Sequence, residues 1–301
     1  MNRSIWLGAA AAVLLGAAAN AQGQPDFSKV QIKTTPLGSG VYMLEGQGGN
    51  ITVAVTADGI IMVDDQFAPL SDKIKAAIAA IGPGRIRYLI NTHHHGDHTG
   101  GNANFAKDGV TIISQENLRS RLAGNALNNQ GAAAEAAPAE ALPVVTFKDG
   151  MNIRLGSNNA EITHLPPSHT DGDSYVYFRN ENVLATGDVF SSTRFPNIDV
   201  RNGGGIDGMI AVQQNLLQVA NDDTKIVPGH GPLAKRADII AFRDMLRTSR
   251  DRIAKLVAEG KSEDETVAAK PLADLEVTRK SDDANRDQFT RLVYRSIKAR
   301  S

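Results

Sequence analysis

Short apolar runs rich in β-branched residues alternate with turn residues through the first half of the chain. Such runs predict strands, and the helical spacing of apolar side chains over residues 70–81, closed by Gly82-Pro83-Gly84, predicts a helix. The elements expected in this half are strands at residues 41–44, 51–55, 59–63, 86–92 and 110–114 and helices at residues 70–81, 101–105 and 116–122.

A second set of strands follows a less regular connection. Residues 124–143 are rich in Ala, Asn and Gly, so we interpret them as a poorly specified connection with room for a short helix over a site. Two runs of strands, each ending in strand–helix units, predict an α+β protein in which two mixed β-sheets form a sandwich with helices outside. The later elements expected are strands at residues 144–147, 151–155, 160–165, 174–178, 182–185 and 225–227, a helix at 208–220, and mostly helical structure from 236 onward with a break near residue 270.

The N-terminus has the pattern of a secretory signal peptide. Arg3 precedes an apolar run over residues 5–19, and Ala19-Asn20-Ala21 supplies small residues at a cleavage site. The apolar run is shorter than the roughly 20 residues that a membrane-spanning helix needs. We therefore expect cleavage after Ala21 and a periplasmic or secreted protein with no membrane span once the signal is removed.

Composition narrows the chemistry of the 301-residue chain. Lys plus Arg (32) nearly balance Asp plus Glu (33), so no overall positive field attracts nucleic acid, and a small-molecule substrate is the expected partner. The absence of cysteine excludes disulfides, thiolate zinc sites, iron–sulfur clusters and cysteine nucleophiles. Any bound metal must be held by His, Asp or Glu.

A histidine-rich motif follows directly after the strand predicted at residues 86–92. It reads His93-His94-His95-Gly96-Asp97-His98, a spacing that is rare by chance in a chain with seven histidines. An extended loop alternates its side chains, which sends His93 and His95 to one side as neutral donors for a zinc ion. Asp97 and His98 are then free to serve a neighbouring ion.

Three further candidate ligands also follow predicted strands. They are His169, Asp188 and His230, and each stands beside glycine or proline or within a polar turn. A single histidine or aspartate in a turn is usually a solvated or capping residue. Together with the histidine-rich motif, however, the three indicate one metal centre.

These motifs resemble those of the metallo-β-lactamase superfamily, over about residues 41–231. The resemblance implies a four-layer αβ/βα sandwich and two zinc ions per chain. It assigns one ion to His93, His95 and His169, the second to Asp97, His98 and His230, and to Asp188 a bridging role seen in many hydrolytic members. With the N-terminal pattern, the expected domain organisation has residues 1–21 as the signal peptide, 22–235 as the hydrolase domain and 236–301 as a helical extension packed on that domain.

Other polar residues are expected to lie around the metal ligands without binding the ions. His94 and His164 lie outside the ligand pattern and are interpreted as structural residues or as residues that support the ligands. Thr92, Ser168 and either Asp64 or Asp65 are candidates to accept hydrogen bonds from the ligand imidazoles.

The implied reaction is hydrolysis by a hydroxide shared between two zinc ions, which attacks a carbonyl polarised by one of them. Asp97 would orient this nucleophile and pass its proton, so it is the expected catalytic residue. Arg194, with Ser191 and Ser192, is the candidate for holding a substrate carboxylate, because arginine suits that geometry.

The substrate class is the more open prediction. Export, zinc and the cysteine-free ligand set favour a β-lactam as the leading substrate class. Asp188 departs from typical β-lactamases, which usually have Cys or Ser there, and favours the alternative of a lactone, ester or thioester hydrolase that is glyoxalase-II-like or lactonase-like. An iron-dependent sulfur dioxygenase and a non-catalytic binding protein of the same fold remain further alternatives.

Overall fold

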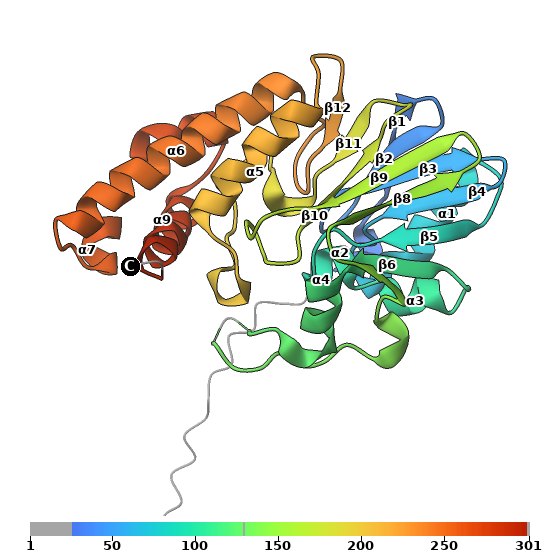
Figure 1. Cartoon of the computed structure of the whole chain (residues 1–301), viewed down its shortest axis with the longest axis horizontal. Coiled ribbons are helices and arrows are strands. Elements are labelled where there is room, and N and C mark those ends of the chain that lie inside the picture. The colour runs from blue at the N-terminus through green and yellow to red at the C-terminus, as the bar shows by residue number, and fades with distance from the viewer. Residues whose placement is uncertain (1–25, 129, 300–301) are drawn as a thin grey trace, which may run out of the picture.

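Two β-sheets pack face to face, with helices on both outer faces, in the computed structural model (Figure 1). The structure describes residues 26–128 and 130–299, so the predicted signal peptide lies outside the described residues. The arrangement is the predicted four-layer sandwich of two mixed sheets with outer helices. Within the described ranges, no helix is both long and apolar enough to cross a membrane.

The first sheet has seven strands in sequence order. Its first four strands are antiparallel neighbours, and β4 to β7 are parallel. The bounds are β1 (Lys33–Gly38), β2 (Val41–Glu45), β3 (Ile51–Thr56), β4 (Gly59–Val63), β5 (Ile86–Ile90), β6 (Thr111–Gln115) and β7 (Val145–Phe147).

The second sheet has five strands in the order β12-β11-β10-β9-β8. Strands β8 to β11 are antiparallel, and β12 joins β11 in parallel. The bounds are β8 (Gly150–Leu155), β9 (Asn158–His164), β10 (Ser174–Phe178), β11 (Val183–Ala185) and β12 (Lys225–Val227).

Helices cover the outer faces of both sheets (Figure 1). The α-helices are α1 (Ser71–Ile81), α2 (Gly96–Thr99), α3 (Asn102–Ala106), α4 (Glu116–Ser120), α5 (Ile206–Val219), α6 (Arg236–Ala258), α7 (Glu263–Ala268), α8 (Glu276–Arg279) and α9 (Asp283–Lys298). Single turns of 3₁₀-helix or, at Arg121–Asn125, π-helix occupy Phe27–Lys29, Ala68–Leu70, Arg121–Asn125, Ala139–Ala141, Gly187–Val189, Val200–Asn202 and Ala273–Leu275.

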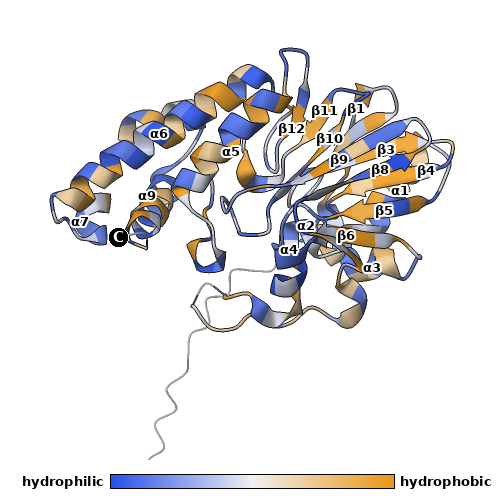
Figure 2. Ribbon diagram, in the orientation of Figure 1, coloured by the Kyte–Doolittle hydropathy of each residue, from blue (hydrophilic) through white to orange (hydrophobic). Residues whose placement is uncertain are grey.

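The core has three layers. Ile61 and Val63 of the first sheet meet Val176 and Phe178 of the second between the sheets. On the outer faces, α1 packs on the first sheet, and α5, α6 and α9 pack on the second. Strands β4 and β5 carry mostly apolar residues in Figure 2, whereas α6 alternates apolar and polar positions along its length.

The structure differs from the predicted elements in three places. Strand β1 was not predicted, because in Lys33–Gly38 only Leu37 is buried and Pro36 interrupts the run at this sheet edge. The histidine-rich loop is not extended throughout, since α2 begins at Gly96 immediately after His95. The described residues of the connection at 124–143 form no α-helix; they form the end of one π-turn, an isolated β-bridge between Leu127 and Ala133 and one 3₁₀ turn.

Candidate metal centre

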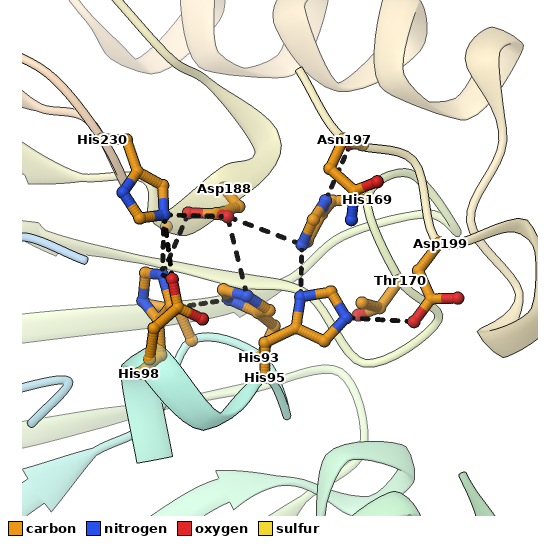
Figure 3. A network of polar contacts seen from close by, with 12 residues as sticks. His93, His95, His98, His169, Thr170, Asp188, Asn197, Asp199 and His230 are labelled. Carbon is orange, nitrogen blue, oxygen red and sulfur yellow. Dashed lines mark hydrogen bonds and ion pairs between the residues drawn. The ribbon is translucent and has the colours of Figure 1, made fainter. Parts of the chain in front are cut away.

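The predicted ligand residues meet at one edge of the sandwich (Figure 3). His93 and His95 follow the end of β5, His169 follows β9, Asp188 follows β11 and His230 follows β12. Because β11 and β12 are parallel, their carboxyl ends lie side by side and bring the last two residues together. The strand order therefore assembles a centre from residues that are far apart in sequence.

The first cluster contains His93, His95 and His169. The Nε2 atom of His169 lies 2.9 Å from Nδ1 of His95, and their rings stand edge-on to each other. One nitrogen from each of the three rings falls within 4.8 Å of the others. This spacing allows the three imidazoles to share one small cation.

The second cluster contains Asp97, His98 and His230. His230 Nε2 lies 3.2 Å from Asp97 Oδ2, and the same nitrogen lies 3.4 Å from His98 Nε2. Both Asp97 and His98 belong to α2, so this single helical turn presents them together toward His230. Two groups that could hold an ion thus match the sets that the resemblance implied, and a third group, His93, His98 and Asp188, combines residues of both.

Asp188 lies between the two clusters. Its Oδ1 atom is 3.1 Å from His98 Nε2, and its Oδ2 atom is 3.3 Å from His230 Nε2 and 3.6 Å from His169 Nε2. One carboxylate therefore faces histidines of both clusters, as Figure 3 shows.

Two glycines make this close approach possible. A Cβ atom on Gly229 would fall 2.0 Å from Asp188 Oδ1, so a larger residue there would displace the carboxylate. Gly187 has φ near +55° and packs against Thr92, and both conditions favour glycine.

Two buried residues that follow strands of the first sheet, Asp64 and Thr92, accept hydrogen bonds from two of the ligand rings. His98 donates from Nδ1 to Asp64 Oδ2 at 2.7 Å, and His93 Nδ1 lies 3.1 Å from the Thr92 hydroxyl, which itself donates to Asp64. Each ring therefore turns its Nε2 atom toward the centre. Of the two aspartates considered from the sequence, Asp64 plays this part, whereas Asp65 accepts from the amide of Gly101.

Residues of the loop between β11 and α5 accept hydrogen bonds from two further rings. His169 donates from Nδ1 to the Asn197 carbonyl at 2.9 Å, and His95 donates from Nε2 to Asp199 at 3.0 Å. Neither acceptor was predicted from the sequence. A backbone carbonyl leaves no side-chain pattern, and Asp199 lies 104 positions from His95, so only the fold brings the two together. The Ser168 hydroxyl bonds to Asp173 and not to an imidazole, so its expected role was wrong.

The remaining two histidines stand outside both clusters. His94 Nε2 lies 3.8 Å from Asp199, and His164 donates from Nδ1 to the Asp173 carbonyl. Burial, followed by the neighbouring His95, lowers the pKa of His94 to about 3, so its ring is neutral.

The charged groups of the centre shift one another's pKa values strongly. Burial opposes the charge of Asp188, but His98 and His230 hold its pKa well below the ordinary value. Burial and the neighbouring His98 lower the pKa of His93, which keeps that ring neutral. Burial also opposes charge on Asp97, yet its hydrogen bond with His230 lowers its pKa to about 2. Burial opposes charge on His98 and His230, but Asp188 raises the pKa of His98 well above its ordinary value and that of His230 to about 9. Without metal, these two rings are therefore protonated beside the ionised carboxylates, whereas His93 is neutral, and a bound cation would replace those protons.

The donor set fits a metal ion. Since His95 and His169 donate their other protons to Asp199 and Asn197, the two nitrogens that face each other at 2.9 Å both present lone pairs. In addition, the buried Nε2 atom of His93 has no hydrogen-bond partner, and Asp188 Oδ1 has only its contact with His98 at 3.1 Å. A cation among the three imidazoles would satisfy the nitrogens of the first cluster, and His and Asp are ligands that zinc accepts.

A pocket of about 300 Å³ opens beside the two clusters, with Asp97, Asp188 and His230 on one side. The loop from Ser191 to Asn197 forms the other side. A second pocket of about 540 Å³ continues past His95 and Asn197 toward α9, which lines it with Gln288, Leu292 and Arg295.

Of the three residues predicted to bind substrate, only Arg194 has a side chain that is free to face the pocket. Arg194 lines it, but its side chain is 55% exposed and lies 3.4 Å from Asp282. The Ser191 hydroxyl donates to the Thr193 carbonyl, and the Ser192 hydroxyl donates to the Pro232 carbonyl at 2.8 Å. Both hydroxyls therefore stabilise the loop, and Ser192 is not part of the pocket wall.

A sequence profile described as the metallo-beta-lactamase superfamily matches residues 44–230. Among characterised proteins, the chain is 30% identical over 150 residues to a hydroxyacylglutathione hydrolase of Methylococcus capsulatus, covering 50% of this chain and 46% of that protein. It is 20% identical over 209 residues to a metallo-beta-lactamase type 2 of a Bacillus species, covering 69% and 76%. The chain spans about half the length of the first curated relatives that it matches.

Solved structures share the fold. A metallo-beta-lactamase from Pontibacter korlensis superposes with a TM-score of 0.61 at 18% identity, covering 72% of this chain and 99% of the other. A secondary alkylsulfatase from a Pseudomonas species superposes with a TM-score of 0.65 at 16% identity, covering 88% and 50%.

Proposed function

Because the chain belongs to the metallo-beta-lactamase superfamily of metallo-hydrolases, we propose that it is a dinuclear zinc hydrolase that cleaves the acyl bond of an ester, lactone or thioester. Every residue of the two clusters falls within the matched region, residues 44–230. The proposal also keeps the two-ion assignment, with three protein donors for each ion and Asp188 shared between them.

The observation that carries the proposal is the position of Asp188. Its two oxygens lie 3.1 Å from His98 and 3.3 Å from His230, and the second oxygen also faces His169. A carboxylate that reaches both clusters supports a pair of ions held close together. Zinc ions held by these residues would lower the pKa of a bound water to near 7 and would polarise a substrate carbonyl.

The protein's own residues orient the reaction. Asp97 is ionised, and its partly exposed carboxylate faces the same pocket as Asp188 and His230. It is therefore placed to accept a hydrogen bond from the attacking water and to direct that water toward the substrate. Asp64 and Asp199 fix the rings of His98 and His95, so the donors need no rearrangement during turnover.

β-Lactam hydrolysis, the leading class in the sequence analysis, becomes the second candidate. In its favour, the match to the Bacillus metallo-beta-lactamase covers 76% of that protein, a larger share than the 46% of the Methylococcus hydroxyacylglutathione hydrolase. The presence of Asp188 at the shared position, together with a higher identity to the hydroxyacylglutathione hydrolase, supports acyl esters and thioesters first.

A substrate panel tests the proposal. Zinc-loaded protein is assayed with aryl and alkyl esters, acyl-homoserine lactones, acyl thioesters, penicillins, cephalosporins and carbapenems. We expect kcat/KM for the best ester, lactone or thioester to exceed that for every β-lactam by at least about tenfold, and Asp188→Ala to abolish this activity. The reverse order would favour the β-lactam candidate, and no turnover of any compound by fully loaded protein would contradict both.

Metal analysis separates the hydrolase from the iron-dependent alternative. We expect close to two zinc ions per chain after purification with zinc, because each cluster offers three donors. One iron and no zinc in protein expressed in balanced metals would contradict the dinuclear zinc assignment and support a dioxygenase.

We further propose that the chain is exported through its N-terminal leader and matures at Gln22. The support is the pattern of Arg3, the apolar run and Ala19-Asn20-Ala21. Mass spectrometry of protein recovered from the periplasm tests this, since retention of residues 1–21 would contradict it.

A further inference from the structure

The loop at residues 190–199 contacts the metal centre from its outer side. Its Asn197 carbonyl accepts from His169, and its Asp199 carboxylate accepts from His95. The amide of Ser192 donates to the His230 carbonyl at 3.3 Å. The same loop forms one wall of the 300 Å³ pocket. Any movement of this loop would therefore change both the pocket and the support of the ligand rings.

This loop is fastened by the C-terminal segment, which lies outside the matched region 44–230. Arg279, the last residue of α8, donates from Nε to the Arg194 carbonyl at 2.8 Å and from Nη2 to the Ser191 carbonyl at 2.9 Å. The Arg279 carbonyl in turn accepts from the Arg194 amide at 2.6 Å. One residue thus satisfies three backbone groups of the loop.

Asn285 of α9 makes a second attachment one residue further along. Its Oδ1 atom accepts from the Phe195 amide at 2.9 Å, and its Nδ2 atom donates to the Phe195 carbonyl at 3.2 Å. The Phe195 ring stacks on Phe289 of the same helix, with centroids 5.2 Å apart. The side-chain amide therefore pairs with the backbone as a neighbouring strand would.

The burial of the Arg279 guanidinium is unfavourable for stability alone. It is 8% exposed, and burial lowers its pKa to about 10 with no carboxylate offsetting that effect among the described residues. Its guanidinium lies over the Phe242 ring, 5.1 Å from the centroid. Burying an arginine whose recorded hydrogen bonds go to carbonyls is unfavourable compared with an apolar residue of similar size. The loop it holds is also strained, because Arg194 has φ of 61°.

We infer that Arg279 and Asn285 are positioning residues that hold the 190–199 loop in the conformation that shapes the substrate pocket and supports His169. This inference rests on the proposed function, since it concerns the pocket in which the acyl substrate binds. The C-terminal segment that carries them also provides the α9 wall of the adjoining 540 Å³ pocket. Substrate recognition is therefore governed in part by residues outside the matched region.

Four variants test the inference in the full-length, zinc-loaded protein. Arg279→Met removes the donors but keeps the apolar volume, and Arg279→Lys keeps one charged donor as the conservative replacement. Asn285→Ala removes both bonds to Phe195. Arg252→Met is the matched control, because Arg252 also donates to a carbonyl, that of Pro271, and to Asp274, and neither partner belongs to the 190–199 loop.

Two measurements are made on each variant that folds with two metals. Amide hydrogen exchange of the peptide covering residues 190–197 reports the loop directly and needs no substrate. Steady-state kinetics with the best acyl substrate separate KM from kcat, and the positioning role predicts a KM that rises more than kcat falls.

We expect exchange of the 190–197 peptide to be at least about tenfold faster in Arg279→Met and Asn285→Ala, with KM about tenfold higher. Arg279→Lys should recover part of both effects, and Arg252→Met should match the wild type. Unchanged exchange and KM in both loop variants would overturn the inference, and so would equal changes in Arg252→Met. Absence of turnover in the wild type would instead contradict the proposed function, while hydrogen exchange would still decide whether the two residues hold the loop.

Discussion

Asp199 Oδ2 lies 3.0 Å from Nε2 of His95, on the side of the ring that faces away from His169. This contact fixes the tautomer of His95, so that Nδ1 carries the lone pair and faces the first cluster. The other histidines of the two clusters, in contrast, turn Nε2 toward the centre. A residue 104 positions further along the chain thus decides which nitrogen of His95 is available as a ligand.

Removing Asp199 is expected to weaken metal binding at the first cluster. In Asp199→Ala, His95 loses its acceptor, and we expect zinc affinity at that cluster to fall about 10- to 100-fold. Competition with a chromophoric chelator measures this loss. Asp222→Ala is the control because its side chain is 93% exposed and far from this contact. Equal affinities in Asp199→Ala and the wild type would show that the contact does not orient the ligand.

Single histidine substitutions should separate the two ions. His169→Ala removes a donor from the first cluster, and His230→Ala removes one from the second. We expect each variant, after desalting, to retain close to one zinc ion instead of two. Substitution with Co²⁺ then distinguishes the remaining sites by their absorption spectra. Loss of both ions from each variant would contradict independent sites.

Stability of chelator-treated protein should decrease as pH rises from about 6.5 to 9. Burial opposes charge on His230, but Asp188 raises its folded-state pKa to about 9, from an unfolded value near 6.5. The resulting stabilisation is complete below 6.5 and is lost as pH rises through 9. Because the His230 side chain is 40% exposed, we expect only about 1 kcal/mol from it. Urea unfolding of the metal-free wild type and His230→Gln measures the difference, and an identical pH slope in both would contradict this assignment.

Arg194→Ala is expected to change substrate binding more than catalysis. The Arg194 guanidinium lines the pocket but is largely exposed, and its bonds to Arg279 use only the backbone. We expect KM to rise by about two- to tenfold for substrates with a carboxylate and to stay unchanged for neutral esters, with kcat preserved. Paired kinetics with a carboxylated ester and its methylated analogue test this. An equal rise in KM for both compounds would remove Arg194 as a carboxylate-binding residue.

Local patterns in the sequence were sufficient to predict the sandwich and the residues that meet at its edge. The histidine-rich motif directly follows an apolar strand, and His169, Asp188 and His230 each follow another. Because strand ends gather at a sheet edge, these residues converge whatever the details of the loops. Export, zinc and the substrate class remain predictions that the experiments above address.

Only the tertiary structure decided what surrounds these residues. Nothing in the sequence near Asp199, Asn197 or Arg279 indicates that they support His95, His169 and the 190–199 loop. Arg194 had the right chemistry for a carboxylate, yet the fold brings it beside Asp282, 88 positions away. Spacing along the chain determines which side chains share a strand end or a helical turn. The partners of those side chains depend on how loops and helices from distant segments pack, and that packing results from burial summed over the whole molecule.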